Sequence, residues 1–197
     1  MYRAVLDTCA LVPSLQRDFL LQLAAEESYS PLWGSGILYE LDYVLAGLDR
    51  KRGIQSSESR RQRLFEQMRH AFPGSEIEAP KDRNYDYGLC DEDDGHVAHA
   101  AIIGKADAIV TDDRRAGFDT AEVLAQASIE VVSPAEFAAN TVAAHPEAGL
   151  RALRELSRRR TDPHQRPEEI LALLVARNSM KGVATIVGPL LEIQRPG

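Results

Sequence analysis

Short apolar segments alternate with helical patterns along the first two thirds of this chain, and this alternation most constrains its fold. Residues 2–6, 106–111 and 129–132 have the length and composition of buried strands. Between them, apolar residues recur at helical spacing, most clearly over residues 35–48. Alternating strands and helices are typical of layered folds built around a parallel sheet. The sequence therefore predicts an α/β fold with a central, mainly parallel sheet.

The last part of the chain has a different pattern. It shows only helical stretches, over residues 147–159, 167–178 and 181–193. We therefore expect two parts: a domain over residues 1–140 and a small helical extension over residues 145–197.

The charge of the chain is acidic but uneven. A net charge of −7 and a pI near 5.3 argue against a protein that coats nucleic acid nonspecifically. Residues 50–63, however, hold six Lys or Arg against one Glu, and residues 154–166 hold five Arg against two acids. Each run is either solvated surface or a contact for phosphates, and the sequence leaves both open.

Several classes of protein are disfavoured. No apolar stretch is long enough to span a bilayer, and the first residues lack the layout of a signal peptide. Cys9 and Cys90 lack the spacing of a metal or redox motif, which favours buried, small apolar side chains. We expect a cytoplasmic protein with no membrane partner.

Acidic residues follow two of the expected strands and precede a helix. Asp7 follows the first strand, and Asp112 and Asp113 follow residues 106–111. The acidic run Asp91–Asp94 comes directly before a short helical pattern that leads into that same strand. Because ligands of open parallel sheets bind at the carboxyl ends of the strands, these acids are expected to converge at one edge.

Taken singly, each of these acids could be a helix cap or a turn residue. Taken together, converging carboxylates repel one another unless some take up protons or a cation binds. Hard oxygen ligands favour Mg²⁺ or Mn²⁺ over zinc. A fourth acid could come from the helix over 35–48, where Glu40 and Asp42 flank the apolar stripe; helix geometry does not choose between them.

Three segments carry a resemblance to a known family. "AVLDTCALVPS", "ILYEL" and "DEDDGHVAHAAIIGKADAIVTDD" resemble the PIN-domain nucleases, most closely the VapC toxins of type II VapBC toxin–antitoxin pairs. The resemblance covers roughly residues 2–138 and implies a three-layer α/β/α fold. It selects Glu40 over Asp42 and the last acid of the acidic run as the third ligand. The implied catalytic and metal-binding residues are Asp7, Glu40, Asp94 and Asp113.

The sequence departs from the family pattern in places. Cys9 stands where many members have Asn, and "DDRRAGF" is looser than the usual turn after that strand. Asp112 is therefore kept as a substitute for Asp113, and Asp91 as a substitute for Asp94. Residues 145–197 have no counterpart in the minimal domain.

The resemblance implies a metal-dependent endoribonuclease that hydrolyses phosphodiester bonds through a metal-activated water. Thr8 and Thr111, next to the acids, are candidates for orienting a carboxylate or a water. Arg114 and Arg115 are candidates for contacts to RNA phosphates. Because aromatic residues are sparse, we expect recognition of RNA shape or of a particular loop rather than a general platform for single strands.

Partners follow from the resemblance alone. Toxins of this type are inhibited by a cognate antitoxin protein, often through a basic side chain placed among the carboxylates, and they commonly form homodimers.

Other functions remain open from the sequence. His96 and His99 form an HxxH pair beside acids, which could indicate a His/Asp metal hydrolase. A phosphatase with an aspartyl nucleophile would favour a second acid two residues after Asp7, where Cys9 stands. From a different class, the chain could be a catalytically inactive PIN-like module that binds RNA or protein.

Overall fold

The computed structural model describes residues 1–55 and 57–193. Ser56, in the basic run over 50–63, and the last four residues of the expected extension lie outside this description. The chain forms two compact units. The sheet unit comprises Met1–Val12 and Ser30–Val132, and the helical unit comprises Pro13–Tyr29 and Ser133–Gly197. These are units of packing, and the expected domains over 1–140 and 145–197 stay a prediction.

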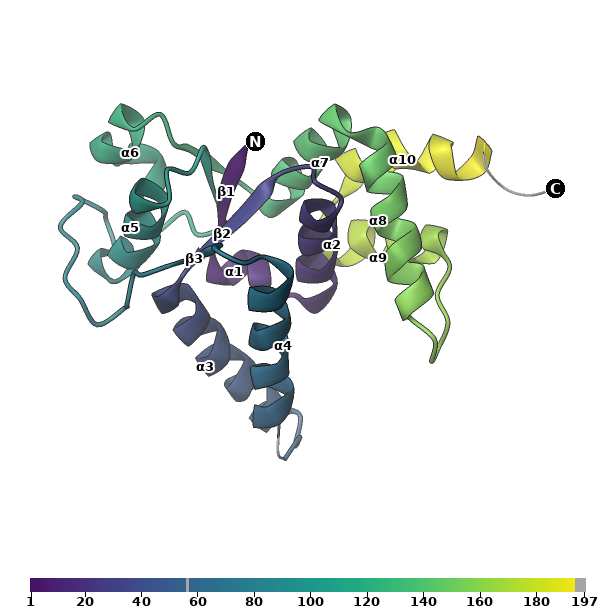
Figure 1. Cartoon of the computed structure of the whole chain (residues 1–197), viewed down its shortest axis with the longest axis horizontal. Coiled ribbons are helices and arrows are strands. Elements are labelled where there is room, and N and C mark those ends of the chain that lie inside the picture. The colour runs from purple at the N-terminus through teal and green to yellow at the C-terminus, as the bar shows by residue number, and fades with distance from the viewer. Residues whose placement is uncertain (56, 194–197) are drawn as a thin grey trace. The chain divides into compact units, whose positions relative to one another are not determined.

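The sheet unit is built on five parallel strands in the order β3-β2-β1-β4-β5. Figure 1 labels the first three of these, β3, β2 and β1. The strands are β1 (Arg3–Leu6), β2 (Ser30–Gly34), β3 (Glu76–Ile77), β4 (Ala108–Val110) and β5 (Glu130–Val132). Helices flank this sheet, so the α/β class with a parallel central sheet is confirmed.

The two central strands bring distant parts of the sequence to one edge. Val5 of β1 pairs with Ile109 of β4, and both side chains are fully buried. Because the strands are parallel and in register, Leu6 lies beside Val110 at their carboxyl ends. The residues that follow them, Asp7 and Thr111, therefore emerge together.

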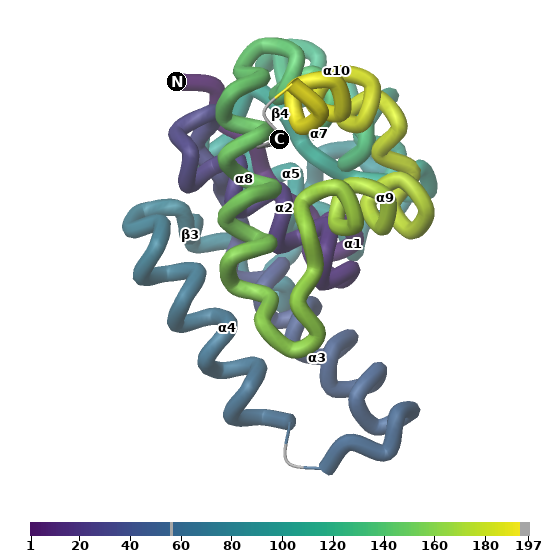
Figure 2. The backbone as a smooth tube through the Cα atoms, turned by 90° about the vertical axis from the view of Figure 1, so that its right-hand side faces the viewer, coloured from purple at the N-terminus to yellow at the C-terminus, as the bar shows by residue number. Residues whose placement is uncertain are grey.

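The described residues of the sheet unit also form the helices α1 (Thr8–Leu11), α3 (Ser35–Lys51), α4 (Glu58–Ala71), α5 (Gly95–Ile103) and α6 (Glu122–Gln126). Two single 3₁₀ turns, η1 (Glu92–Asp94) and η2 (Phe118–Thr120), precede α5 and α6. Helix α5 packs against β1, β2 and β4. Helix α3 runs three residues beyond the expected end at 48, and with α4 it forms a helical hairpin that Figure 2 shows clearly.

Ion pairs join the two helices of this hairpin. Arg61 Nε of α4 lies 2.7 Å from Asp42 Oδ1 of α3, and Arg60 pairs with the buried Asp49. Two of the six basic residues of the run over 50–63 are therefore engaged within the protein.

The helical unit contains α2 (Ser14–Ala25), α7 (Pro134–Ala144), α8 (Pro146–Arg159), α9 (Pro167–Asn178) and α10 (Lys181–Ile193). Tyr29 and Phe137 meet edge to face in its core, with ring centroids 4.8 Å apart. A Cβ at Gly149 would lie 2.5 Å from Cγ1 of Val142, so glycine allows α7 and α8 to pack closely. The helices expected after residue 145 are thus present.

The structure bears on two further expectations, the lack of a membrane span and the burial of the two cysteines. Within residues 1–55 and 57–193, no helix combines the length and the apolar character needed to cross a bilayer. The cytoplasmic location stays a prediction. The expectation of buried cysteines is wrong: Cys90 is exposed in the segment before η1, and Cys9 is only half-buried in the short helix α1, so neither lies in the core.

Candidate active site

Asp7 is held at the carboxyl end of β1 by donors on both of its oxygens. The Thr8 backbone N–H donates to Oδ1 at 2.6 Å, and the Thr111 hydroxyl donates to Oδ2 at 2.7 Å. The residue is 6% exposed. Burial raises the pKa of Asp7 and these hydrogen bonds lower it; burial dominates, and the charge of Glu40 adds to the increase. The carboxylate is therefore fixed in place at an electrostatic cost.

Glu40 reaches the same place from α3. The helix starts close to α5: a Cβ at Gly36 would lie 2.6 Å from the His96 ring, so glycine permits the approach. The Thr8 hydroxyl donates to Glu40 Oε2 at 2.9 Å, and the Lys81 ammonium bonds to Oε1. Burial raises the pKa of Glu40, but His96, Lys81 and Thr8 outweigh it and bring the pKa to about 2.

The structure separates Glu40 from the other acid that helix geometry left open. Asp42 pairs with Arg61 of α4, while Glu40 faces Thr8 and the segment before α5. Glu40 is thus the acid of α3 that joins Asp7.

Asp94 begins α5 without capping it. Its side chain makes no cap hydrogen bond, whereas Asp91 accepts from the Asp93 N–H at 3.1 Å and so caps the preceding turn. Burial, together with the smaller effect of the charges of nearby acids, raises the pKa of Asp94 to about 6; these acids are Asp7, Asp91, Asp113 and Glu40. This shift agrees with a position of Asp94 near the other acids, and the charge of Lys81 is also coupled to it.

Asp113 lies in the loop after β4 and is partly used by that loop. Its N–H donates to the Thr111 hydroxyl at 2.9 Å, and its Oδ1 accepts from the Arg115 N–H at 2.8 Å. Asp112, the substitute, is exposed and contributes its N–H to the Cys9 sulfur at 3.1 Å. Arg114 and Arg115 are both exposed beside this loop.

Cys9 contacts the site, which the sequence analysis did not foresee. Its sulfur lies 3.3 Å from Asp7 Oδ2 and 3.2 Å from the Thr111 hydroxyl. Burial and the charge of Asp7 raise the pKa of the thiol to about 12, so it stays protonated and can donate. The signal in the sequence was the departure itself, since Cys9 replaces the Asn of many family members.

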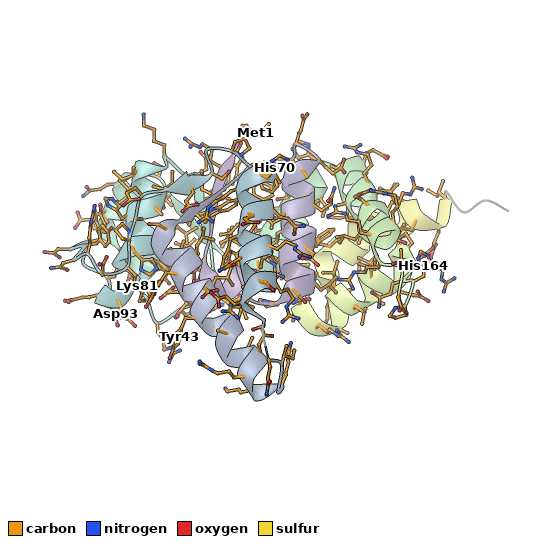
Figure 3. The ribbon with its side chains drawn as sticks, turned by 60° about the horizontal axis from the view of Figure 1, so that its bottom comes forward. Met1, Tyr43, His70, Lys81, Asp93 and His164 are labelled. Atoms are coloured by element: carbon orange, nitrogen blue, oxygen red, sulfur yellow. The ribbon has the colours of Figure 1, made fainter. Side chains whose placement is uncertain are left out.

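Lys81 is the second residue missed by the sequence analysis. Besides bonding to Glu40, its ammonium lies 3.4 Å from the Asp93 carbonyl oxygen. Figure 3 labels Lys81 and Asp93, which lie on the same side of the sheet unit. Burial lowers the pKa of Lys81, but the hydrogen bond and charge of Glu40 outweigh it and raise the pKa. No pattern marks this residue, because it lies in an irregular loop.

The two histidines have different surroundings. His96 is 1% exposed; its Nδ1 donates to the Asp93 carbonyl at 2.9 Å, and its Nε2 lies 3.4 Å from Glu40 Oε2 without a well-aligned hydrogen bond. His99 instead shares a hydrogen bond with Tyr87 Oη at 2.8 Å and packs on the Tyr85 ring. The pair therefore does not offer two nitrogens to one ion.

Two exposed tyrosines flank Glu40 on α3. Tyr39 and Tyr43 are each 69% exposed and lie one helical turn apart. The apolar stripe of α3 indicated that these positions lie off the buried face, and both rings belong to the helix that carries Glu40.

The acids suit a hard cation chemically but are not arranged around one. Among residues 1–55 and 57–193, no three His, Cys, Asp or Glu side chains are placed so that they could hold a metal ion. The carboxylates are instead bonded to other side chains: Thr111 and Cys9 contact Asp7, and Lys81 and Thr8 bond to Glu40. The Lys81 ammonium is a stand-in cation among oxygen ligands, and the donor set fits Mg²⁺ or Mn²⁺.

Comparison with known proteins agrees with this geometry. No curated protein and no solved structure matches the chain. The family model described as "PIN domain" matches residues 3–115, which is more than half of the chain and includes all four acids. PIN domains are in general nucleases that use divalent metal ions. The chain belongs to the PIN-domain family.

Proposed function

We propose that this protein is a metal-dependent endoribonuclease whose catalytic residues are Asp7, Glu40, Asp94 and Asp113. The observation that carries the proposal is the meeting of Asp7 and Glu40 at Thr8, whose N–H donates to Asp7 Oδ1 at 2.6 Å and whose hydroxyl donates to Glu40 Oε2 at 2.9 Å. The pKa of Asp94, raised to about 6 by burial and by the charges of the other acids, agrees with its lying near them. Four carboxylates from separate segments have no structural reason to share a site at such an electrostatic cost. A divalent cation removes that cost.

The proposed roles follow from position. The four carboxylates would hold Mg²⁺ or Mn²⁺, which would supply positive charge to the scissile phosphate and make an attacking water more acidic. Thr8 and Thr111 orient the carboxylates of Glu40 and Asp7 through their hydroxyls.

The proposed substrate is RNA with an unpaired segment. Arg114 and Arg115, exposed beside Asp113, would contact phosphates. Tyr39 and Tyr43 present exposed rings beside Glu40, and aromatic side chains stack on unpaired bases. These two exposed rings support binding of single-stranded RNA, whereas the low aromatic content had led us to expect recognition of RNA shape or of a particular loop.

Cleavage of RNA by purified protein tests the proposal. Total cellular RNA and a labelled single-stranded RNA would be incubated with Mg²⁺ or Mn²⁺, with EDTA, and with Asp94→Asn protein. Metal-dependent fragments that disappear in the variant would support it. Cleavage that persists in EDTA or in Asp94→Asn would contradict it.

We further propose that the nuclease is the toxin of a toxin–antitoxin pair, with a cognate antitoxin protein as partner and a homodimer as its assembly. The sequence resemblance to VapC toxins is the support. Co-expression with the product of a small adjacent reading frame tests this: a stable complex that no longer cleaves RNA is expected. Cleavage unaffected by every adjacent product would argue for a stand-alone nuclease.

A catalytically inactive binding module is the second candidate. The pairing of Glu40 with Lys81, and the lack of a ready metal geometry in the described residues, favour it. Folded protein that binds RNA equally well with and without metal, and never cleaves it, would establish this reading.

A further inference from the structure

Lys81 lies where a positive charge is needed. Its ammonium bonds to Glu40 Oε1 and approaches the Asp93 carbonyl oxygen at 3.4 Å. The negative charges of Glu40, Asp94 and Asp93 all act on it. The ammonium thus interacts with two of the four acids and with backbone beside one of them, as a small cation would.

Both carboxylate oxygens of Glu40 are in contact with donors. One oxygen faces Lys81, and the other faces the Thr8 hydroxyl at 2.9 Å and His96 Nε2 at 3.4 Å. Each oxygen of Glu40 therefore already has a donor beside it, and a divalent cation bound to Oε1 would be repelled by the adjacent Lys81 ammonium.

The surroundings of Lys81 allow it to move away. It lies in the irregular segment between β3 and η1, and its side chain is 31% exposed. A long, flexible stem can return the ammonium to water at small cost, because lysine is a mobile point charge rather than a fixed fork.

We propose that Lys81 is the resident counter-ion of Glu40 in the metal-free protein, and that it leaves this carboxylate when a divalent metal binds. Lys81 and the metal are then alternative partners of one oxygen. The inference deepens the proposed function and rests on the metal site that the function requires. It makes Lys81 a residue that sets metal affinity rather than one that acts on RNA.

Metal binding measured without RNA tests the inference. Mn²⁺ would be titrated calorimetrically into EDTA-stripped, dialysed protein at fixed pH and ionic strength. Lys81→Met removes the charge and keeps most of the stem, and we expect it to bind Mn²⁺ about fivefold more tightly, as for the loss of a partly exposed ion pair. Lys51→Met, at the exposed end of α3, is the control for net charge and is expected to leave the affinity unchanged.

A direct view of the ammonium adds a readout that does not depend on affinity. The chain has four lysines, so lysine-selective NMR of the side-chain Nζ and Cε gives few signals. Mg²⁺ is expected to shift the signal that is absent in Lys81→Arg, and no other.

The outcomes separate this inference from the proposed function. Unchanged or weaker Mn²⁺ binding in Lys81→Met, or a Lys81 signal that ignores Mg²⁺ at saturation, would overturn the inference and leave a metal-dependent nuclease intact. Absence of Mn²⁺ binding in both wild type and Lys81→Met would overturn the metal-dependent function, and the exchange with it.

Discussion

The carboxylates of the two units differ in the charges that surround them. In the helical unit, Glu155 pairs with Arg158 at 2.8 Å and Glu26 with Arg151 at 2.7 Å, all within reach of solvent. In the sheet unit, Asp7 and Asp94 are drawn into a cluster of acids whose charges oppose their ionisation. The helical unit thus matches each of these charges with an arginine, while the sheet unit concentrates like charge at one edge.

The sheet unit also contains this contrast within its own site. Glu40, bonded to Lys81 and Thr8, has a pKa of about 2, whereas that of Asp94 is about 6. Glu40 makes a direct ion pair with Lys81, whereas burial and the surrounding acids dominate the pKa of Asp94. Substitutions at matched carboxylates can test whether this difference reflects function.

The largest effect is expected for Asp7→Asn. The amide keeps the shape of the side chain but removes a charge from the proposed metal site, so kcat for RNA cleavage should fall at least about 100-fold. Glu155→Gln, the same kind of change in the helical unit, should leave kcat unchanged. Single-turnover cleavage of a labelled RNA measures both. Comparable losses in the two variants would mean that activity follows general stability rather than the site.

A smaller effect is expected for Tyr39→Ala and Tyr43→Ala. Base stacking on an aromatic side chain contributes about 1–3 kcal/mol per base, so KM for single-stranded RNA should rise roughly fivefold or more, with kcat little changed. Tyr2→Ala is the control, since Tyr2 is also exposed but precedes β1 at the opposite end of that strand. Unchanged KM in both α3 variants, with wild-type folding, would remove these rings from the RNA surface.

A third effect concerns the stability of the metal-free protein. The pKa of Asp94 is raised from 3.8 to about 6, so its contribution to folding is complete below pH 3.8 and is lost as the pH rises through 6. Asp94→Asn removes this titration and should increase the free energy of unfolding at pH 7.5 by about 1–2 kcal/mol, after allowance for solvent screening. Urea denaturation in EDTA measures the change.

The same experiment has an internal control. At pH 4.5 the stability difference between Asp94→Asn and wild type should be much smaller, and saturating Mn²⁺ should reverse its sign at pH 7.5. A variant less stable than wild type in EDTA at pH 7.5 would show that Asp94 is a structural residue, despite its place among the acids.

Much of this site was predictable because it depends on strand order. Asp7 follows a strongly apolar strand, and parallel neighbours end at a common edge, so its closeness to Asp113 follows from pattern and topology. The separation of Asp94 from Asp91 was less accessible, since it depends on a single 3₁₀ turn that Asp91 caps. Sequence periodicity carries no information about such a turn.

The neutralising partners of the site could not be predicted. Lys81 comes from a loop without periodicity, and its position depends on how that loop crosses the start of α5. Cys9 was visible as a departure from the family pattern, but its contact with Thr111 depends on the pairing of β1 with β4. The four acids as one catalytic set stay a prediction, whereas the contacts that decide the charges of Asp7 and Glu40 could be found only in the structure.

The smallest effect is expected in the helical unit, and its pH dependence should have the opposite sign. Hydrogen bonds from Arg158 lower the pKa of Glu155 to about 2, so any stabilisation is present above its ordinary pKa of 4.5 and is lost as the pH falls toward 2. Solvent screens this exposed pair, so Glu155→Gln should have the same melting temperature as wild type within error at pH 7.5, both in EDTA and in saturating Mn²⁺. A scanning calorimetry series from pH 3 to 8 measures it. The contributions of Glu155 and Asp94 to stability would thus change with pH in opposite directions. A large destabilisation by Glu155→Gln at neutral pH would mean that paired charges in the helical unit are also important for stability. The proposed site would then not differ from the helical unit in how its carboxylates affect folding.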